Sequence, residues 1–254
     1  MTIETIAAKD GAQTLRPFPS IWIGLSSVIL FFVIQLVVVG IIGIISVAIS
    51  VADGSIKTAV QNANMAATLK TMAVPFMWSI FASGIATLLA LGIFLSFKGR
   101  ATAIGLNNWS KLPLSKTLII AALTLAAAYG FNYAYGTFVD LEKAQSDVTD
   151  MIKAIPRNPV NLTMLFFAVS ILPGITEELV FRGLLQNSLS HLMPAGAAIA
   201  VSAAIFGAVH GQLAAFPALM CLGAAYGYIY YKTGSLRINI ALHVINNGLA
   251  LALS

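Results

Sequence analysis

The sequence predicts an all-α, polytopic transmembrane protein. We expect a bundle of about seven membrane-spanning helices, with six to eight as the range. Composition and run length carry this prediction. The 254 residues are 59% hydrophobic and only 9% charged, and their mean hydropathy is +0.90. In a soluble domain roughly a quarter of the residues are charged. The much lower share here indicates that most of the surface faces lipid instead of water. The charges also avoid the long apolar runs, as they must in lipid-facing segments.

The predicted spans follow from the apolar runs, since a helix needs about 20 apolar residues to cross a bilayer. The first run is chiefly interrupted by Gln35, and it is too long for the core of a cleavable signal peptide, so we expect it to remain as a span. The predicted spans are Ile21–Ser50, Met72–Phe97, Lys116–Phe138, Val160–Leu189, Met193–Val209, Leu213–Tyr231 and Ile238–Leu253.

Polar residues divide this single membrane domain into three parts: an N-terminal segment (residues 1–20), scaffold helices with their loops (residues 21–159), and a final set of helices that carry the candidate functional residues (residues 160–254). The first three spans have almost no ionisable residues between their ends, whereas the last four have several, and a charge inside a span predicts function. These are Glu177, Glu178, Arg182, His210 and His243. The polar stretch Val139–Pro159 is either an interfacial helix, able to act as a lid, or a solvated loop.

The net charge of +5 and the pI near 9.4 do not indicate a nucleic-acid partner, because the basic residues stand singly or in pairs in loops. The Lys98–Lys116 linker is basic without an acid, which favours a cytoplasmic location for it and, with seven spans, for the N-terminus. Short loops without appended domains favour the inner (plasma) membrane of a bacterium. Membrane lipid is therefore an expected partner.

The segment ILPGITEELVFRG contains the first group of intramembrane charges. Pro173 and Gly174 predict a kink or break in the helix. Glu178 and Arg182 are four residues apart with the acid first, so we expect an intrahelical ion pair. Glu177 is rotated by about 100° from Glu178 and lacks such a partner, so it can exchange protons as a general base must. The alternative is that both acids simply neutralise the arginine.

Two further pairs have the same four-residue spacing, which places their members on one helical face. Phe206 and His210 form the pair in FGAVHG, and His243 and Asn247 form the pair in HVINN. Alone, His210 is better explained as a packed core histidine, and the pair of His243 and Asn247 is equally well explained by interhelical hydrogen bonding. A carboxylate, two histidines and an amide from three spans are together the groups needed to activate water and to stabilise a tetrahedral intermediate.

These residues resemble the CAAX-protease and bacteriocin-processing membrane endopeptidases, the CPBP or Abi family, which includes the type II CAAX prenyl endopeptidases. The match consists of EExxxR from Glu177 to Arg182, FxxxH from Phe206 to His210, HxxxN from His243 to Asn247, and the intervening TGSL. It extends roughly from residue 160 to residue 253. The three motifs in this order are specific, whereas each one alone is weak.

The resemblance implies an intramembrane endopeptidase whose polar cavity lies between the C-terminal helices. By analogy with the family, Glu177 and His210 activate the attacking water, while His243 and Asn247 stabilise the oxyanion. Three residues support this site: Glu178, Arg182 and Phe206. The expected substrate is a hydrophobic or lipidated peptide or protein of the membrane, with a prenylated CAAX protein as one form.

Three alternatives stay open at this point. Two histidines and a carboxylate form a zinc-type ligand set, but HExxH is absent and the family is described as glutamate-dependent, so we favour a protease without a metal or other cofactor. A non-catalytic role in bacteriocin immunity or peptide binding would need the surface but not the chemistry of Glu177. A proton-coupled transporter fits less well, because its halves should be related to each other.

Overall fold

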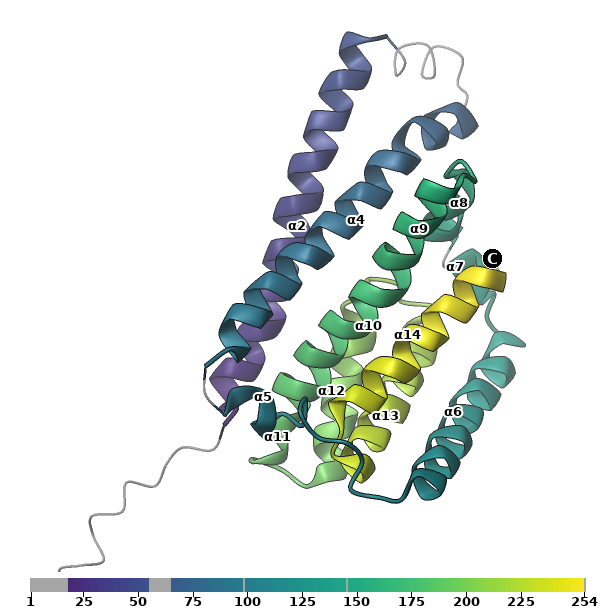
Figure 1. Cartoon of the computed structure of the whole chain (residues 1–254). Helices are drawn as coiled ribbons and strands as arrows, with labels where there is room; N and C mark the ends of the chain where they lie inside the picture. Colours follow the sequence, from purple (N-terminus) through teal and green to yellow (C-terminus); the bar gives the residue numbers. More distant parts are fainter. Residues whose placement is uncertain (1–17, 55–64, 98, 145, 254) are drawn as a thin grey trace, which may run out of the picture.

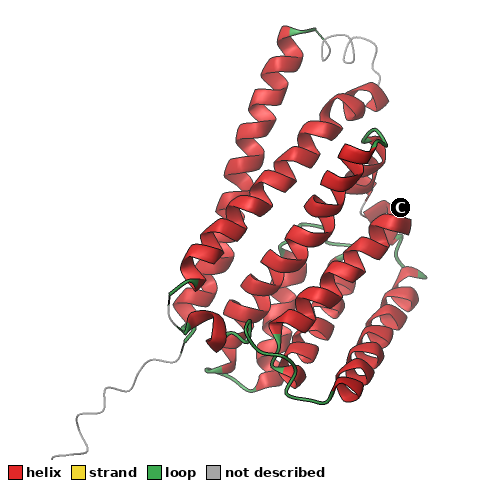
Figure 2. Ribbon diagram, in the orientation of Figure 1, coloured by secondary structure: helices red, strands yellow, loops and turns green. Residues whose placement is uncertain are grey.

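The computed structural model describes residues 18–54, 65–97, 99–144 and 146–253, and all its regular elements are helices (Figure 2). The predicted fold class is confirmed. The helices are α2 (Ile21–Ala52), α4 (Met65–Leu95), α5 (Arg100–Ala103), α6 (Leu114–Gly136), α7 (Leu141–Ala144), α8 (Ser146–Ala154), α9 (Pro159–Phe166), η1 (Phe167–Ile171), α10 (Leu172–Glu177), η2 (Glu178–Gln186), α11 (Asn187–Ser190), α12 (Ala195–Ala208), α13 (Phe216–Thr233) and α14 (Leu236–Leu253).

A helix corresponds to each of the seven predicted spans, but α12 and α13, at the fifth and sixth, are not among the helices long and apolar enough to cross a membrane. Five helical segments of the described chain are long and apolar enough to cross a membrane: α2, α4 from Thr71 to Leu95, α6, the continuous run from α9 to α11, and α14. The helix α12 has 14 residues and reaches only about 21 Å at 1.5 Å per residue. With α13 it forms a hairpin beside the longer helices (Figure 1). The chain is therefore an integral membrane protein.

The helices α2 and α4 pack along each other and extend beyond the rest of the bundle (Figure 1). Ser20 caps the start of α2 by accepting a hydrogen bond from the backbone N–H of Ile23. Most of the large apolar side chains along α2 are exposed, as expected for a helix that faces lipid. The N-terminal segment predicted to be cytoplasmic lies mostly outside the described residues.

The polar stretch between the third and fourth spans contains two helices, α7 and α8. Ile152 and Ile155 are buried with Ala73 and Met77 of α4 in a small apolar cluster. The interpretation of the α8 part as a solvated loop was therefore wrong, because its apolar residues cover α4.

The fourth span is helical from residue 159 to residue 190, but two of its stretches, η1 and η2, are π-helical. The expected disturbance around Pro173 therefore takes the form of wider turns on either side of α10, without a break. Proline has no N–H, so the Val169 carbonyl four residues earlier cannot receive its usual helical bond from residue 173. That carbonyl accepts a hydrogen bond from Asn247 Nδ2 of α14, at 3.3 Å.

A close contact joins α14 to α10, because Gly174 leaves room for Val244. A Cβ at Gly174 would lie 2.6 Å from Val244 Cγ2. The Ser170 hydroxyl, one turn earlier, donates to the Val244 carbonyl at 2.7 Å. This docking places His243 beside Glu177 and Glu178, and Asn247 beside the Val169 carbonyl.

All nine residues of η2 are buried, so this segment forms the centre of the bundle. Small residues let α12 and α13 approach it and each other. A Cβ at Gly223 would lie 3.3 Å from Ala203 Cα, and one at Gly227 would lie 2.6 Å from Gln186 Oε1.

Candidate active site

Glu178 is the centre of a buried polar network at the start of η2. Its side chain is completely buried, and the expected ion pair with Arg182 is present, with 3.1 Å between Oε1 and Nη1. The same carboxylate accepts hydrogen bonds from His243 Nδ1 at 2.9 Å and from Asn239 Nδ2 at 3.1 Å. A buried carboxylate must be compensated in this way, and Glu178 has donors from two helices.

Arg182 connects this network to α12 and α13. Its Nη2 donates to the Gly223 carbonyl at 3.0 Å, and its guanidinium lies 4.6 Å from the ring centre of Phe206 and 5.4 Å from that of Tyr226. These contacts use both the hydrogen-bonding fork and the flat face of the guanidinium. Arg182 is therefore placed to hold three helices together.

His243 lies between the two neighbouring glutamates. Since an ionised carboxylate only accepts, Nδ1 of His243 is the donor toward Glu178, which leaves Nε2 as the second nitrogen. This Nε2 is 3.8 Å from Glu177 Oε2. The imidazole is also stacked on Tyr226, with 4.9 Å between ring centres and 14° between planes. Ring orientation is thus fixed by a hydrogen bond and by packing.

His210 lies in the turn just after α12, and its ring is also oriented by a hydrogen bond from Nδ1. Its Nδ1 is 2.8 Å from the Phe206 carbonyl, which can only accept, so Nδ1 donates and Nε2 carries the lone pair of the neutral ring. The Phe206 ring packs between the two histidines, 4.9 Å from His210 and 6.4 Å from His243.

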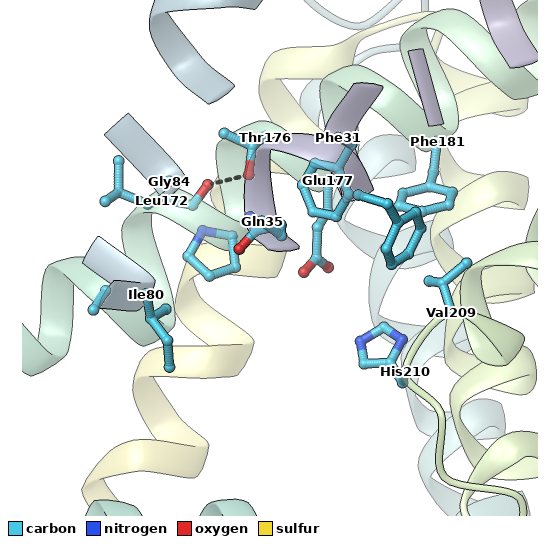
Figure 3. A pocket seen from close by; sticks show the side chains of 13 residues that line it. Phe31, Gln35, Ile80, Gly84, Leu172, Thr176, Glu177, Phe181, Val209 and His210 are labelled. Atoms are coloured by element: carbon cyan, nitrogen blue, oxygen red, sulfur yellow. Dashed lines mark hydrogen bonds between the residues drawn. The ribbon is translucent and has the colours of Figure 1, made fainter. Parts of the chain in front are cut away.

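Glu177 and His210 line one cavity of about 200 Å³. In Figure 3 the Glu177 carboxylate and the His210 ring point into the same open space. Glu177 is 16% exposed, whereas its neighbour Glu178 is completely buried. The cavity wall is mostly apolar and is formed by α2, α4, the fourth span and the turn after α12. Its residues are Phe31, Phe32, Gln35, Ile80, Gly84, Ala168, Leu172, Pro173, Thr176, Glu177, Phe181, Val209 and His210.

Asn247 lies one turn beyond His243 on α14 but is not among the residues that line this cavity. Its amide donates to the Val169 carbonyl and accepts a hydrogen bond from Asn246 Nδ2 at 3.2 Å. Asn246 also accepts a hydrogen bond from the Tyr129 hydroxyl of α6. Glu177 and His210 thus share one cavity. His243 contacts Glu177, but neither His243 nor Asn247 belongs to the lining of this cavity.

Two buried residues of the network were missed in the sequence analysis. Asn239 is four residues before His243, so the spacing of Asn239, His243 and Asn247 was a readable signal of one polar face. Its Nδ2 donates both to Glu178 and to the Tyr226 carbonyl at 2.7 Å. Nothing in the sequence singles out Tyr226, because an aromatic residue in an apolar helix is common.

The zinc alternative does not fit the arrangement of the described residues. No three histidine, cysteine or acidic side chains in this part of the chain are grouped closely enough to hold a metal ion. We therefore assign no step to a metal.

Comparisons with known proteins agree with the resemblance over the C-terminal part. Residues 159–249 match the family model for Rce1-like proteins, the type II CAAX prenyl endopeptidases. The chain is also 26% identical over 115 residues to the protein named "Putative membrane peptidase YdiL" of Bacillus subtilis (strain 168). That alignment covers 45% of this chain and 44% of YdiL, so the chain matches less than half the length of this relative. No solved structure is significantly similar.

Proposed function

Because its C-terminal helices match the type II CAAX prenyl endopeptidase family, we propose that this protein is an intramembrane endopeptidase that hydrolyses peptide bonds with activated water. One observation carries the proposal: Glu177, at the end of α10, and His210, in the turn after α12, line a single cavity that is otherwise mostly apolar. A base in a largely apolar cavity within the membrane domain has little use in packing, whereas it suits proton transfer during hydrolysis.

In the proposed reaction, a water molecule binds between the Glu177 carboxylate and His210 Nε2 and loses a proton to this pair. The resulting hydroxide attacks the peptide carbonyl carbon, and a C–O bond forms. The tetrahedral intermediate then collapses, the C–N bond breaks, and the proton is delivered to the leaving amine. One water molecule thus supplies the oxygen of the new carboxyl group and the proton of the leaving amine.

The oxyanion of the intermediate would be stabilised by His243 and Asn247. Nδ1 of His243 already donates to Glu178, so Nε2 can donate to an oxyanion only when the ring carries both protons. The two carboxylates around the ring, together with Arg182, make a charge-balanced group when His243 is an imidazolium. We propose that His243 acts in this form, and that Glu178 and Arg182 hold it in position.

The proposed substrates are hydrophobic or lipidated peptides that reach the site from the membrane, including prenylated CAAX-type sequences. The test uses purified protein with a farnesylated CAAX peptide and a panel of unlipidated hydrophobic peptides, in ordinary water and in ¹⁸O water. We expect cleavage with one ¹⁸O in the new carboxylate, unaffected by a metal chelator. Loss of cleavage on chelation, with recovery on adding zinc, would contradict the metal-independent mechanism.

We further propose that the end of the bundle formed by α5, the α11–α12 turn and the α13–α14 turn faces the cytoplasm of a bacterial cell. The helices α5, α6, α13 and α14 contribute Arg100, Lys116, Lys232 and Arg237 to this end, and the backbone N–H of Lys111 donates to the Thr233 carbonyl there. Residues 99–116 contain no acid. Single cysteines placed at Lys111 and at Arg157, in a Cys221→Ser background, should differ in labelling by an impermeant maleimide. Labelling of Lys111→Cys from outside intact cells would reverse the orientation.

A further inference from the structure

Gln35 is the main polar interruption of the first span, and the structure gives it a fixed position. The hydroxyl of Ser83, on α4, lies 2.6 Å from Gln35 Oε1 and 2.9 Å from the Ile80 carbonyl, so its one proton is shared between these two acceptors. Ser83 is completely buried, so this bond is shielded from solvent. An amide inside a membrane helix needs partners for its polar atoms, and here the carbonyl half is satisfied between α2 and α4.

The amino half of the same amide remains available at the cavity. No acceptor within hydrogen-bond distance of Gln35 Nε2 occurs among the described residues, and Gln35 lines the cavity together with Glu177 and His210 (Figure 3). A hydrogen-bond donor left unpaired in an apolar wall costs free energy unless a ligand uses it.

The other polar side chains of this wall cannot replace it. The Thr176 hydroxyl donates to the Leu172 carbonyl at 2.8 Å, inside its own helix. The neutral ring of His210 uses its N–H for the Phe206 carbonyl. The Glu177 carboxylate is an acceptor. Within the described lining, the Gln35 amino group is therefore the neutral donor that faces the cavity.

A peptide that enters this cavity brings backbone carbonyls that have lost their water. Each one needs a donor, because an unsatisfied carbonyl in an apolar environment is costly. We propose that Gln35 Nε2 donates to a backbone carbonyl of the peptide substrate and that Ser83 orients the amide for this contact. Gln35 is then a substrate-binding residue contributed by α2, outside the segment that matches the endopeptidase family.

This inference rests on the proposed function only in taking the ligand to be a peptide, and binding tests it without catalysis. The experiment measures the Kd of a fluorescent farnesylated CAAX peptide for the full-length Glu177→Gln protein in lipid nanodiscs. Adding Gln35→Met, which keeps the side-chain length but removes the amide, should weaken binding about tenfold, as expected for one hydrogen bond. Ser46→Ala is the matched control, since Ser46 also lies on α2 but bonds only to the Ile42 carbonyl.

A double-mutant cycle separates a binding role from a packing role. Ser83→Ala alone should weaken binding about threefold, and it should add nothing in the Gln35→Met background, because its effect passes through the amide. If Gln35→Met fails to fold, Ser83→Ala provides the same test with a smaller change. Additive losses at the two positions would overturn the proposal.

The outcomes also distinguish this inference from the proposed function. A folded Gln35→Met protein that binds the peptide with unchanged Kd would overturn the role of Gln35, whatever the turnover. A protein that binds no peptide at all would overturn it as well. If peptide binding depends on Gln35 but the wild-type protein cleaves no peptide, the role of Gln35 is supported and the endopeptidase proposal is contradicted.

Discussion

Replacing Arg182 by methionine is expected to destabilise the protein strongly, because it leaves the Glu178 carboxylate buried without its positive partner. Glu178 is completely buried, and its ion pair with Arg182 measures 3.1 Å. Breaking a buried pair by removing one partner costs about 3–5 kcal/mol. Arg182 also donates to the Gly223 carbonyl, so this second group is left unpaired. We therefore expect Arg182→Met to lower the free energy of unfolding by at least about 3 kcal/mol.

Thermal unfolding in a fixed detergent measures this loss. About 2–4 °C per kcal/mol applies to a protein of this size, so Arg182→Met should lower the Tm by about 6 °C or more. The double variant Glu178→Gln with Arg182→Met removes both charges and keeps an acceptor for His243, so it should recover part of the loss. A single variant that melts within about 2 °C of the wild type would refute this reasoning, as would a double variant that loses the sum of both single effects.

Two further variants test the positions of α14. Asn239→Leu removes the hydrogen bond from the Asn239 amide to Glu178, so we expect about a tenfold lower kcat with an unchanged KM on the best peptide substrate. A change confined to KM would contradict a positioning role. Gly174→Ala would place a Cβ 2.6 Å from Val244 Cγ2, so we expect a loss of about 1–3 kcal/mol, measured by thermal unfolding. Gly196→Ala, where nothing lies within 4 Å, is the control and should be neutral or stabilising; equal losses at the two glycines would contradict the close contact.

The sequence predicted those parts of the fold and site that depend on neighbours along the chain. Apolar run length located the helices, and four-residue spacing predicted the pair of Glu178 with Arg182, since both properties are local. Residues matched to family motifs identified the candidate catalytic groups. Whether Glu177, His210, His243 and Asn247 catalyse hydrolysis stays a prediction.

Contacts between helices could not be predicted from the sequence. The bond from Ser83 to Gln35 joins residues 48 positions apart, and the rotation of both α2 and α4 about their axes decides whether it forms. Asn247 finds the Val169 carbonyl only because Pro173 lacks an N–H and α14 docks at that turn. The wide π-helical turns around α10 have no sequence signature as simple as that of a helix cap.

The central claim is that the two neighbouring glutamates have different tasks, with Glu177 acting on water and Glu178 holding the network together. The most direct test is the turnover of purified Glu177→Gln on a peptide cleaved by the wild type, together with its Tm. We predict a kcat at least about 100-fold lower with a Tm close to that of the wild type, because Glu177 faces the cavity and makes no contact shorter than 3.8 Å to His243. A folded Glu177→Gln protein that cleaves at the wild-type rate would contradict the account.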